Sequence, residues 1–519
     1  MRKHWGWGRV DQALSAAQLQ QAAPGVIEYL GFGRADPELP VPLEAASLPE
    51  PRRPPAELSD IADAGRHARA THALGKAYRD VVRGFRGDFG SAPDFVVFPR
   101  GHADVERVLQ WSERHNVAVI PYGGGTSVVG GVEPRDLDGF DGAISLDLKH
   151  FDAVLEVDPV ARAAHVGAGA TGPRVEEQLR PHGLTTRFFP QSFEFSTVGG
   201  WIATRAGGHY ASGPTHIDDL VESVHAITPV GVWQSRRLPA SGAGPSPDRW
   251  LFGSEGTLGV ITSAWLRVVP RPEHKFSATV RFPDFPTGCA AIRHVLQSGL
   301  RPDNCRLIDG AEAPGADPRP MLVLGFEGAA ENRSLQEAAL AICVASGGQP
   351  QPARDAEQAW RGAFLQAPYL RDTLISLGVL AETFETAVTW DRLDALVTSV
   401  RQTAEEAVVQ VCGQPGRVTC RLTHVYPDGA APYFTVLAPV PRGEEVAIWD
   451  EIKVRVSDAL LAQGGTITHH HAVGRDHVPW YRRQRPDVFA AALAASKAAV
   501  DPTGILNPGV LGLDRPPAE

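Results

Sequence analysis

Three consecutive histidines, His469, His470 and His471, stand in the run GGTITHHHAVGRDH near the end of the chain. An unperturbed imidazole has a pKa near ~6.5, so it can take up or release a proton around neutral pH, or ligate a metal. We expect this run to be a strand, whose neighbouring side chains point to opposite faces. The three histidines then cannot all reach one ion, so we predict acid–base chemistry and no metal site.

Far upstream, three glycine-rich segments indicate a cofactor. The first, PYGGGTSVVGG (121–131), follows a predicted strand, and its successive glycines remove every Cβ. Backbone N–H groups can then converge on a pyrophosphate, and nearby hydroxyls add donors. PQSFEFSTVGGWIATRAGG (190–208) and GSEGTLGVIT (253–262) have the same character. Each could be a structural turn when taken alone, but together they could wrap one long ligand that carries phosphate.

These segments supply the candidate cofactor-binding residues. They are Pro121, Tyr122, Gly123, Gly124, Gly125, Thr126, Ser127, Pro190, Gln191, Ser192, Phe193, Glu194, Phe195, Ser196, Ala203, Thr204, Arg205, Ala206, Glu255, Gly256, Thr257, Leu258, Gly259, Val260 and Ile261.

A literal GxGxxG also occurs, as GAGATG (167–172), and we reject it as a dinucleotide fingerprint. The strand before it, ARAAHV, is not a continuous apolar run, and Pro173 follows at once. No acidic residue lies in a suitable strand ~20 residues further on.

The elements that must position these residues follow from hydrophobic periodicity. We predict a helical stretch over 59–83, a strand over 95–100, an amphipathic helix over 103–116 and a strand over 117–125. A hairpin is expected over 153–169, where two short strands flank a turn.

The chain divides into four parts. Residues 1–60 form an N-terminal segment with a Pro-rich connector, and 61–271 carry the three glycine segments. From 272 to 440, strands alternate with longer helices, which predicts a separate α+β domain. Residues 441–519 are mainly helical and contain the histidines.

Composition excludes several classes of protein. The 519 residues have 43% hydrophobic and 21% charged side chains and a formal net charge of −10, which argues against a nucleic-acid binder. None of the five cysteines forms a CxxC pair, which favours a reducing, cytoplasmic setting. The N-terminus, MRKHWGWGRV, lacks the apolar core of a signal peptide, and no apolar run is long enough for a membrane span.

The three glycine segments resemble, in type and order, the FAD-binding signatures of the vanillyl-alcohol oxidase/p-cresol methylhydroxylase flavoproteins, and the resemblance covers about 90–510. It implies an α+β chain with the two-subdomain FAD-binding PCMH-type fold. An α+β cap domain would face the flavin, and the helical C-terminal segment would return to it. Some members bind FAD through a histidine in the first glycine loop. That loop has no histidine here, so the resemblance implies noncovalent FAD.

Within this family, the chain is most similar to the alkylglycerone-phosphate synthase branch. The matching segments are KHWGWG, PQSFEFS, WIATRA, PYLRDTLISLGVLAETFETAVTW (368–390) and HHHAVG. The resemblance implies a substrate arginine at Arg371, a second functional arginine at Arg306 and an acid–base tyrosine at Tyr433. One or two histidines of the triplet would face the flavin, and another would orient the backbone.

The branch's reaction exchanges the acyl group of acyl-dihydroxyacetone phosphate for a fatty alcohol, in ether-lipid synthesis, without net electron transfer. Tyr433 would move a proton to and from the leaving and entering oxygens. A phenol with a pKa near ~10 needs a nearby histidine or cation to lower that pKa. A histidine of the triplet would be this partner or the base at C1, and Arg371 would bind the phosphate or the carbonyl oxygen.

The alternative is an FAD-linked dehydrogenase or oxidase of a 2-hydroxy acid or alcohol. Such proteins carry a GHxGDGNxH segment and a later EHGIG. Here the comparable stretch, THVYPDGAAPYF, keeps His424 but has Pro432 and Tyr433 in place of the second histidine, although the ending DPTGILNPG resembles the dehydrogenases. A binding or structural role on the same fold is a third hypothesis.

The expected partners are a lipid substrate and a fatty alcohol. Peripheral contact with a membrane surface and a homodimer both stay open. Trp5 and Trp7 are candidates for a membrane contact, although we favour a packed N-terminal tail.

Overall fold

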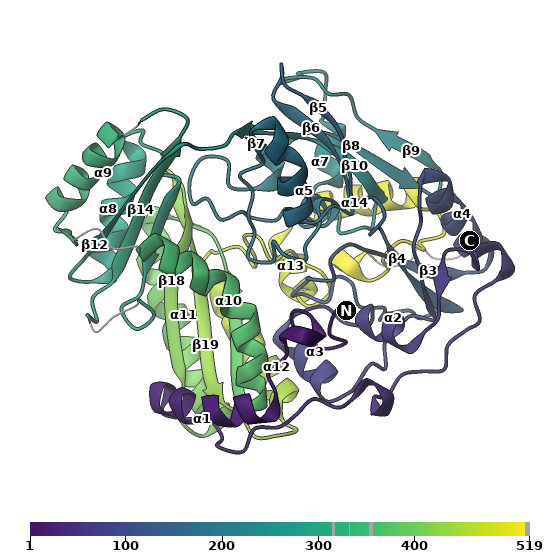
Figure 1. Cartoon of the computed structure of the whole chain (residues 1–519), viewed down its shortest axis with the longest axis horizontal. Helices are drawn as coiled ribbons and strands as arrows, with labels where there is room; N and C mark the ends of the chain where they lie inside the picture. The colour runs from purple at the N-terminus through teal and green to yellow at the C-terminus, as the bar shows by residue number, and fades with distance from the viewer. Residues whose placement is uncertain (314–316, 332, 352–355, 514–519) are drawn as a thin grey trace.

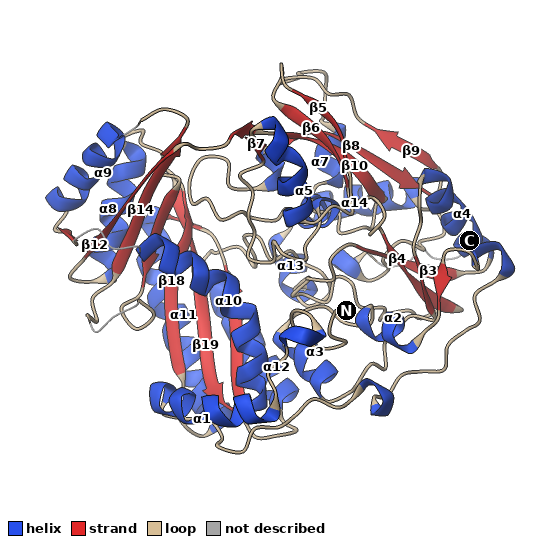
Figure 2. Ribbon diagram, viewed as in Figure 1, coloured by secondary structure: helices blue, strands red, loops and turns tan. Residues whose placement is uncertain are grey.

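The computed structural model describes residues 1–313, 317–331, 333–351 and 356–513. Two bodies lie side by side (Figure 1): one built from the N-terminal half together with the C-terminal segment, and one from the green middle of the chain. Both mix helices and sheets, as Figure 2 shows. The expected α+β class is confirmed.

The first body contains two sheets. A four-stranded sheet has the order β1-β2-β4-β3, in which β2, β4 and β3 are parallel. Its strands are β1 (Ala62–Asp63), β2 (Phe95–Val97), β3 (Val117–Tyr122) and β4 (Gly142–Asp147). The first glycine segment follows β3, at the carboxyl edge of this parallel unit, which is where ligands bind in such sheets.

The second sheet of this body has the order β5-β6-β10-β8-β9 and is antiparallel throughout. Its strands are β5 (Val154–Asp158), β6 (Ala163–Gly167), β8 (Val221–Thr228), β9 (Gly231–Gln234) and β10 (Val260–Arg267). The predicted hairpin is β5–β6. GAGATG therefore begins at the end of an antiparallel strand and not in a parallel βαβ unit, in agreement with its rejection as a dinucleotide fingerprint. A small pair, β7 (Leu184–Thr185) and β11 (Val269–Pro270), adjoins this body.

The middle of the chain forms an eight-stranded sheet with the order β15-β12-β14-β13-β18-β19-β16, and β17 pairs with β19. The strands are β12 (His274–Arg281), β13 (Asn304–Ile308), β14 (Met321–Gly328), β15 (Gln349–Pro350), β16 (Val379–Glu385), β17 (Val388–Thr389), β18 (Arg417–Val425) and β19 (Gly429–Pro439). Helices α8 (Phe285–Gln297), α9 (Arg333–Ala345), α11 (Trp390–Cys412) and α12 (Glu445–Ala462) share one apolar core with this sheet. Helix α10 (Ala356–Ser376) precedes β16.

Helices of the first body cover its sheets: α4 (His102–Arg114), α5 (Gly172–Leu179), α6 (Val198–Thr204), α7 (Pro247–Leu251), α13 (Val478–Gln484) and α14 (Asp487–Val500). Its core includes Val473, Leu493, Ile505 and Leu506, and a parallel bridge joins Leu506 to Val119 in β3. The C-terminal segment thus leaves the middle sheet and packs into the first body (Figure 1).

The single helical stretch predicted over 59–83 is wrong. The structure has two helices, α2 (Arg66–Thr71) and α3 (Tyr78–Phe85), separated by a loop. Gly75 in this loop lies against the first glycine segment so closely that a Cβ would fall 2.4 Å from the carbonyl oxygen of Ser127. The tertiary contact therefore overrides helix propensity here.

The N-terminal segment packs across both bodies. Trp5 and Trp7 are buried, and Trp7 meets Phe195 edge to face with ring centroids 5.2 Å apart. These tryptophans are thus part of a packed tail and have no surface to offer a membrane. Helix α1 (Ala16–Leu30) follows and lies against the middle body (Figure 1).

The five cysteines are all free, as the absence of a pairing pattern predicts. Among the described residues, no helix combines the length and the apolar character that a membrane span requires.

Candidate functional site

A cavity of about 480 Å³ lies where the two bodies meet, and the three glycine segments contribute to its wall. The predicted cofactor residues that line it are Pro121, Tyr122, Gly123, Gly124, Gly125, Thr126, Ser127, Pro190, Gln191, Ser192, Ser196, Ala203, Thr204, Ala206, Glu255, Gly256, Gly259 and Ile261. The sequence-predicted segments are thus brought together around one space.

The other predicted cofactor residues do not line this cavity. Thr257, Leu258 and Val260 belong to the third segment, and their side chains are fully buried. Arg205 pairs with Asp218, and Glu194 accepts a hydrogen bond from Tyr369 at 2.7 Å. Phe195 stacks beneath the guanidinium of Arg2, and Phe193 packs against Phe189.

The glycines of the first segment lie directly against the second segment. A Cβ on Gly123 would fall 2.2 Å from Thr197 Oγ1, and one on Gly124 would fall 2.0 Å from the carbonyl oxygen of Phe195. The third segment closes on the first in the same way, since a Cβ on Gly256 would lie 2.9 Å from Pro121. The glycines thus let the backbones of the three segments meet closely along the cavity wall, and a wall rich in glycine backbone fits the pyrophosphate of a dinucleotide such as FAD.

Glu255 connects the third glycine segment to the segment that follows the histidines. Its carboxylate accepts hydrogen bonds from the backbone amides of Val473 and Gly474, all between 2.9 and 3.0 Å. Burial raises the pKa of Glu255 to about 7, against the effect of these amides. Hence the cofactor loop and the histidine segment are held by one buried carboxyl group.

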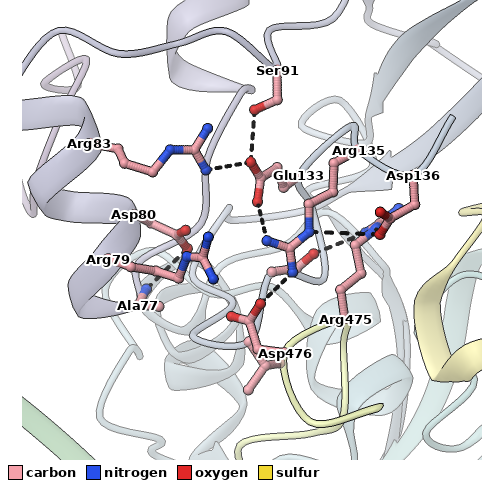
Figure 3. A network of polar contacts seen from close by, with 12 residues as sticks. Ala77, Arg79, Asp80, Arg83, Ser91, Glu133, Arg135, Asp136, Arg475 and Asp476 are labelled. Carbon is pink, nitrogen blue, oxygen red and sulfur yellow. Dashed lines mark hydrogen bonds and ion pairs between the residues drawn. The ribbon is translucent and has the colours of Figure 1, made fainter. Parts of the chain in front are cut away.

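A second network holds the histidine segment from the other side (Figure 3). Arg135 lies between Glu133 and Asp476, and Glu133 also accepts from Arg83 at 2.5 Å. Arg475 donates to the carbonyl oxygen of Gly130 at 2.9 Å. Residues 475 and 476 are thereby tied to the end of the first glycine segment and to the residues that follow it.

The histidine triplet is not in a strand, so that expectation is wrong. Glu385, at the end of β16, accepts hydrogen bonds from the three backbone amides of His469, His470 and His471 at 2.7–3.1 Å. Thr468 donates a further bond from its hydroxyl at 2.6 Å. The backbone of the triplet therefore curls around one buried carboxylate, and its side chains do not alternate between two faces.

The three imidazoles consequently point in different directions. His470 and His471 line the cavity. His469 instead contacts Tyr426, whose hydroxyl lies 2.7 Å from its Nε2, and His216, whose Nε2 lies 3.1 Å from the same atom. The Nδ1 atoms of His469 and His470 lie 2.9 Å apart, within hydrogen-bond distance.

Burial lowers the pKa of all three imidazoles, that of His471 to about 3, although Glu385 favours their protonation. The histidines are therefore neutral near pH 7 and able to accept a proton. Burial alone would raise the pKa of Glu385, but the histidines and Thr468 hold it well below its usual value. Glu385 is thus a carboxylate that orients the triplet.

Tyr433 of β19 is buried, lines the same cavity and is the register partner of Glu385 across β16 and β19. Its ring centroid lies 5.5 Å from that of His471. A cation is present, as the sequence suggested, since Arg421 lies over the ring at 4.2 Å. Burial nevertheless outweighs Arg421, so the pKa of Tyr433 is raised, contrary to the expected lowering.

Both predicted arginines also line the cavity. Arg306 of β13 is almost completely buried and donates from Nη2 to the carbonyl oxygen of His209 at 2.5 Å. Arg371 of α10 is half-buried, and its Nε has no hydrogen-bond partner among the residues that the structure describes. The cavity thus carries two guanidinium groups suited to anionic oxygens.

His424, His469 and His470 come close enough to be considered as metal ligands, with ligand atoms within 4.8 Å of one another. Both ring nitrogens of His424 already have partners, the carbonyl oxygen of Gly208 at 2.9 Å and the hydroxyl of Thr423 at 3.2 Å. Both nitrogens of His469 are also engaged. The absence of a metal stays a prediction, for which these hydrogen bonds give a physical reason.

Sequence reasoning missed Glu385, Tyr426 and His216. Glu385 lies within the segment 368–390 that carries Arg371, but Glu382 stands three residues before it, so the local sequence did not single out Glu385. Nothing local marks His216, which meets His469 only through the fold.

Comparison with protein families agrees with this architecture. Residues 93–235 match the model of an FAD binding domain, and residues 271–511 match the C-terminal domain of FAD linked oxidases. FAD is thus the cofactor, and the FAD-binding fold expected from the glycine segments is confirmed.

Several relatives resemble most of the chain. Alkyldihydroxyacetonephosphate synthase of Trypanosoma brucei brucei is 30% identical over 483 residues, which cover 87% of this chain and 78% of the relative. The Dictyostelium discoideum synthase is 30% identical over 471 residues, covering 85% and 77%. Glycolate oxidase subunit GlcD of Bacillus subtilis is 25% identical over 441 residues, covering 81% and 89%.

Solved structures give the same order of likeness. A crystal structure of alkyldihydroxyacetonephosphate synthase superposes with a TM-score of 0.81 at 26% identity and covers 98% of both chains. p-Cresol methylhydroxylase superposes with a TM-score of 0.68 at 15% identity, covering 88% of this chain and 95% of the other, which shows a shared fold. The chain belongs to the alkyldihydroxyacetonephosphate synthase family of FAD-dependent enzymes.

Proposed function

We propose that this protein exchanges the acyl group of acyl-dihydroxyacetone phosphate for a fatty alcohol, with FAD bound and no net redox change. One observation carries the proposal beyond family membership. Tyr433, the adjacent His470 and His471, Arg306 and Arg371 reach, from four separate segments, the cavity that the glycine segments enclose. The motif that supplies a histidine metal pair in the dehydrogenases has Pro432 and Tyr433 here in place of its second histidine, which favours the exchange reaction.

The exchange breaks the bond between C1 and the acyl oxygen and forms a bond between C1 and the alcohol oxygen. The proton on C1 is acidic because a ketone adjoins it, so a neutral imidazole can remove and return it. We assign this role to His470 or His471, whose lowered pKa keeps the imidazole in its basic form.

Tyr433 exchanges a proton with the oxygens that leave and enter. The leaving oxygen takes the proton of Tyr433, so the fatty acid departs as the neutral acid, and the phenolate then takes the proton of the entering alcohol. A phenol with a raised pKa stays protonated at neutral pH, so Tyr433 begins as a hydrogen-bond donor to the leaving oxygen. Arg421, over its ring, stabilises the phenolate when the proton leaves.

Arg371 and Arg306 bind the oxyanions of the three-carbon unit. A guanidinium binds a phosphate or an enolate oxygen through two parallel N–H groups, and burial strengthens such contacts. FAD supplies an electron-poor ring system that activates the three-carbon unit without net electron transfer. The three glycine segments hold this cofactor, and we propose that they do so without a covalent bond.

The lipid chains need an apolar entrance. Tyr29 of α1 and Leu370 of α10 line the cavity and are 64% and 52% exposed, so they mark where it opens to the surface. Peripheral membrane contact at this opening is part of the proposal.

The decisive experiment incubates the purified, yellow protein with acyl-dihydroxyacetone phosphate and hexadecanol without an electron acceptor. Release of fatty acid with formation of the ether supports the proposal. Dye reduction by a 2-hydroxy acid without ether formation would establish the dehydrogenase instead. Acid precipitation that leaves the flavin in the pellet would contradict noncovalent binding.

A further inference from the structure

Lys76 differs from the other buried lysines of this chain. Of the six lysines, Lys3, Lys76, Lys453 and Lys497 are buried. Three of them pair with a carboxylate. Lys3 lies 2.6 Å from Asp372, Lys453 lies 3.1 Å from Glu382, and Lys497 pairs with Asp501. The ammonium of Lys76, which is 9% exposed, has no ion pair or hydrogen bond with any residue that the structure describes.

Lys76 lies in the loop between α2 and α3, and this loop places it at the cavity wall. Its backbone amide donates to the carbonyl oxygen of Ser127 at 2.6 Å, which fixes the residue against the first glycine segment. Lys76 lines the cavity together with Ser127 and Arg371. The ammonium is thus held at the junction of the cofactor loop and the helix that carries the substrate arginine.

The charges around Lys76 do not neutralise it. Two of its neighbours, Arg2 and Arg371, are cations. The nearby carboxyl group of Asp372 already accepts from Lys3 and from the backbone amide of Trp7, and that of Asp80 accepts from Ala77. Burial, Arg2 and Arg371 therefore lower the pKa of Lys76 to about 7. Such a buried and unpaired amine is costly unless a ligand provides the missing charge.

We propose that Lys76 binds a phosphate oxygen of the ligand that occupies this cavity. Two sources share this chemistry: the pyrophosphate of FAD, and the phosphate of the three-carbon substrate, the second of which rests on the proposed function. A phosphate oxygen within reach would restore the protonated amine and form a charge-assisted hydrogen bond.

The test compares Lys76→Met with Lys76→Arg, and uses Lys453→Met as a matched control outside the cavity. FAD affinity is measured by flavin fluorescence on titration of apoprotein. Substrate affinity is measured on FAD-loaded protein, as the change in flavin absorbance with dihydroxyacetone phosphate and with unphosphorylated dihydroxyacetone. Neither measurement requires turnover, so failure of the proposed exchange reaction would not obscure the result.

If FAD is the ligand, Lys76→Met weakens FAD binding at least tenfold, and Lys76→Arg recovers most of it. If the substrate is the ligand, FAD affinity is unchanged, and the preference for dihydroxyacetone phosphate over dihydroxyacetone falls at least tenfold. Either result supports a phosphate-binding Lys76.

The melting temperature of the apoprotein separates a ligand-binding role from a structural one. Lys76→Met removes an unpaired buried charge, so its melting temperature should rise. Lys453→Met leaves the buried carboxylate of Glu382 without its cation, so its melting temperature should fall. The proposal is overturned if Lys76→Met binds FAD and phosphate within twofold of the natural protein. It is also overturned if Lys76→Met loses apoprotein stability and ligand affinity together.

Discussion

Glu385 and Tyr433 are register partners on β16 and β19, and each serves the histidine segment in a different way. Glu385 binds the backbone of the triplet, while the Tyr433 ring lies beside His471. A single pair of adjacent strands thus sets the position of Tyr433 relative to the imidazoles. The middle sheet therefore organises the side chains of the site, and the first body supplies the cradle for FAD.

Tyr433→Phe and His470→Ala should each keep FAD but lose turnover. Removing one acid–base group slows proton transfer by roughly 10²–10⁴-fold. The flavin absorbance spectrum checks cofactor content, and ether formation from labelled alcohol checks the rate. Full activity in either variant would refute the role assigned to that residue.

Glu385→Gln should disorganise the triplet. An amide offers one acceptor oxygen where the carboxylate has two, and its NH2 group would face backbone N–H donors. Each unsatisfied buried amide costs about 1–3 kcal/mol, so thermal stability and turnover should both fall. Thr468→Val removes one of the bonds to Glu385 and is the milder comparison. Equal effects of the two changes would argue against the central role of the carboxylate.

Gly124→Ala should abolish FAD binding, because its Cβ would fall 2.0 Å from the carbonyl oxygen of Phe195. Gly101→Ala is the matched control, since no atom lies within 4 Å of a Cβ at that position and its backbone is extended. The ratio of flavin to protein absorbance should be near zero in the first variant and normal in the second. Normal flavin content in Gly124→Ala would contradict the cradle.

The stability of the apoprotein should depend on pH through Lys76. Folding lowers the pKa of this amine from 10.5 to about 7, so the charged form is disfavoured in the folded state. The loss of folding free energy caused by burying the charged amine is therefore complete below pH 7. It decreases between pH 7 and 10.5 and is absent above pH 10.5. Lys76→Met should therefore be more stable than the natural apoprotein by on the order of a few kcal/mol at pH 7 and by little at pH 10.5.

Urea denaturation of both apoproteins at the two pH values measures this difference. Comparing the two cancels the titration of groups that do not interact with the amine. His4 and Asp80 do interact with it, so their titration does not cancel and is fitted separately. A difference in unfolding free energy that stays constant with pH would mean that burying the Lys76 amine does not destabilise the folded protein.

Prolonged dialysis against a chelator should leave activity unchanged. Both ring nitrogens of His424 and His469 are occupied by hydrogen bonds, so a metal would have to break several of them. Loss of activity that added Zn²⁺ or Mn²⁺ restores would show that His424, His469 and His470 hold a metal after all.

The sequence by itself indicated a phosphate-bearing ligand and the parts of its cradle, and the resemblance of these motifs to a flavoprotein family implied FAD. Successive glycines after a strand have few uses other than close backbone approach, so the three segments could be identified locally. The order of these segments and the motifs around Arg371, Tyr433 and His470 indicated the family. Strong local periodicity also gave the β5–β6 hairpin and the helix of residues 102–114.

Only the tertiary structure decided how the triplet is oriented and which residues surround it. The expected strand failed at His469–His471 because the backbone hydrogen bonds go to Glu385, which lies more than 80 residues earlier in the chain. The break between α2 and α3 places Gly75 against Ser127, and this contact lies more than 50 residues away along the chain, beyond any local signal. Burial of Tyr433 and Lys76 likewise depends on the meeting of the two bodies, and that burial, rather than residue type, sets the direction of their pKa shifts.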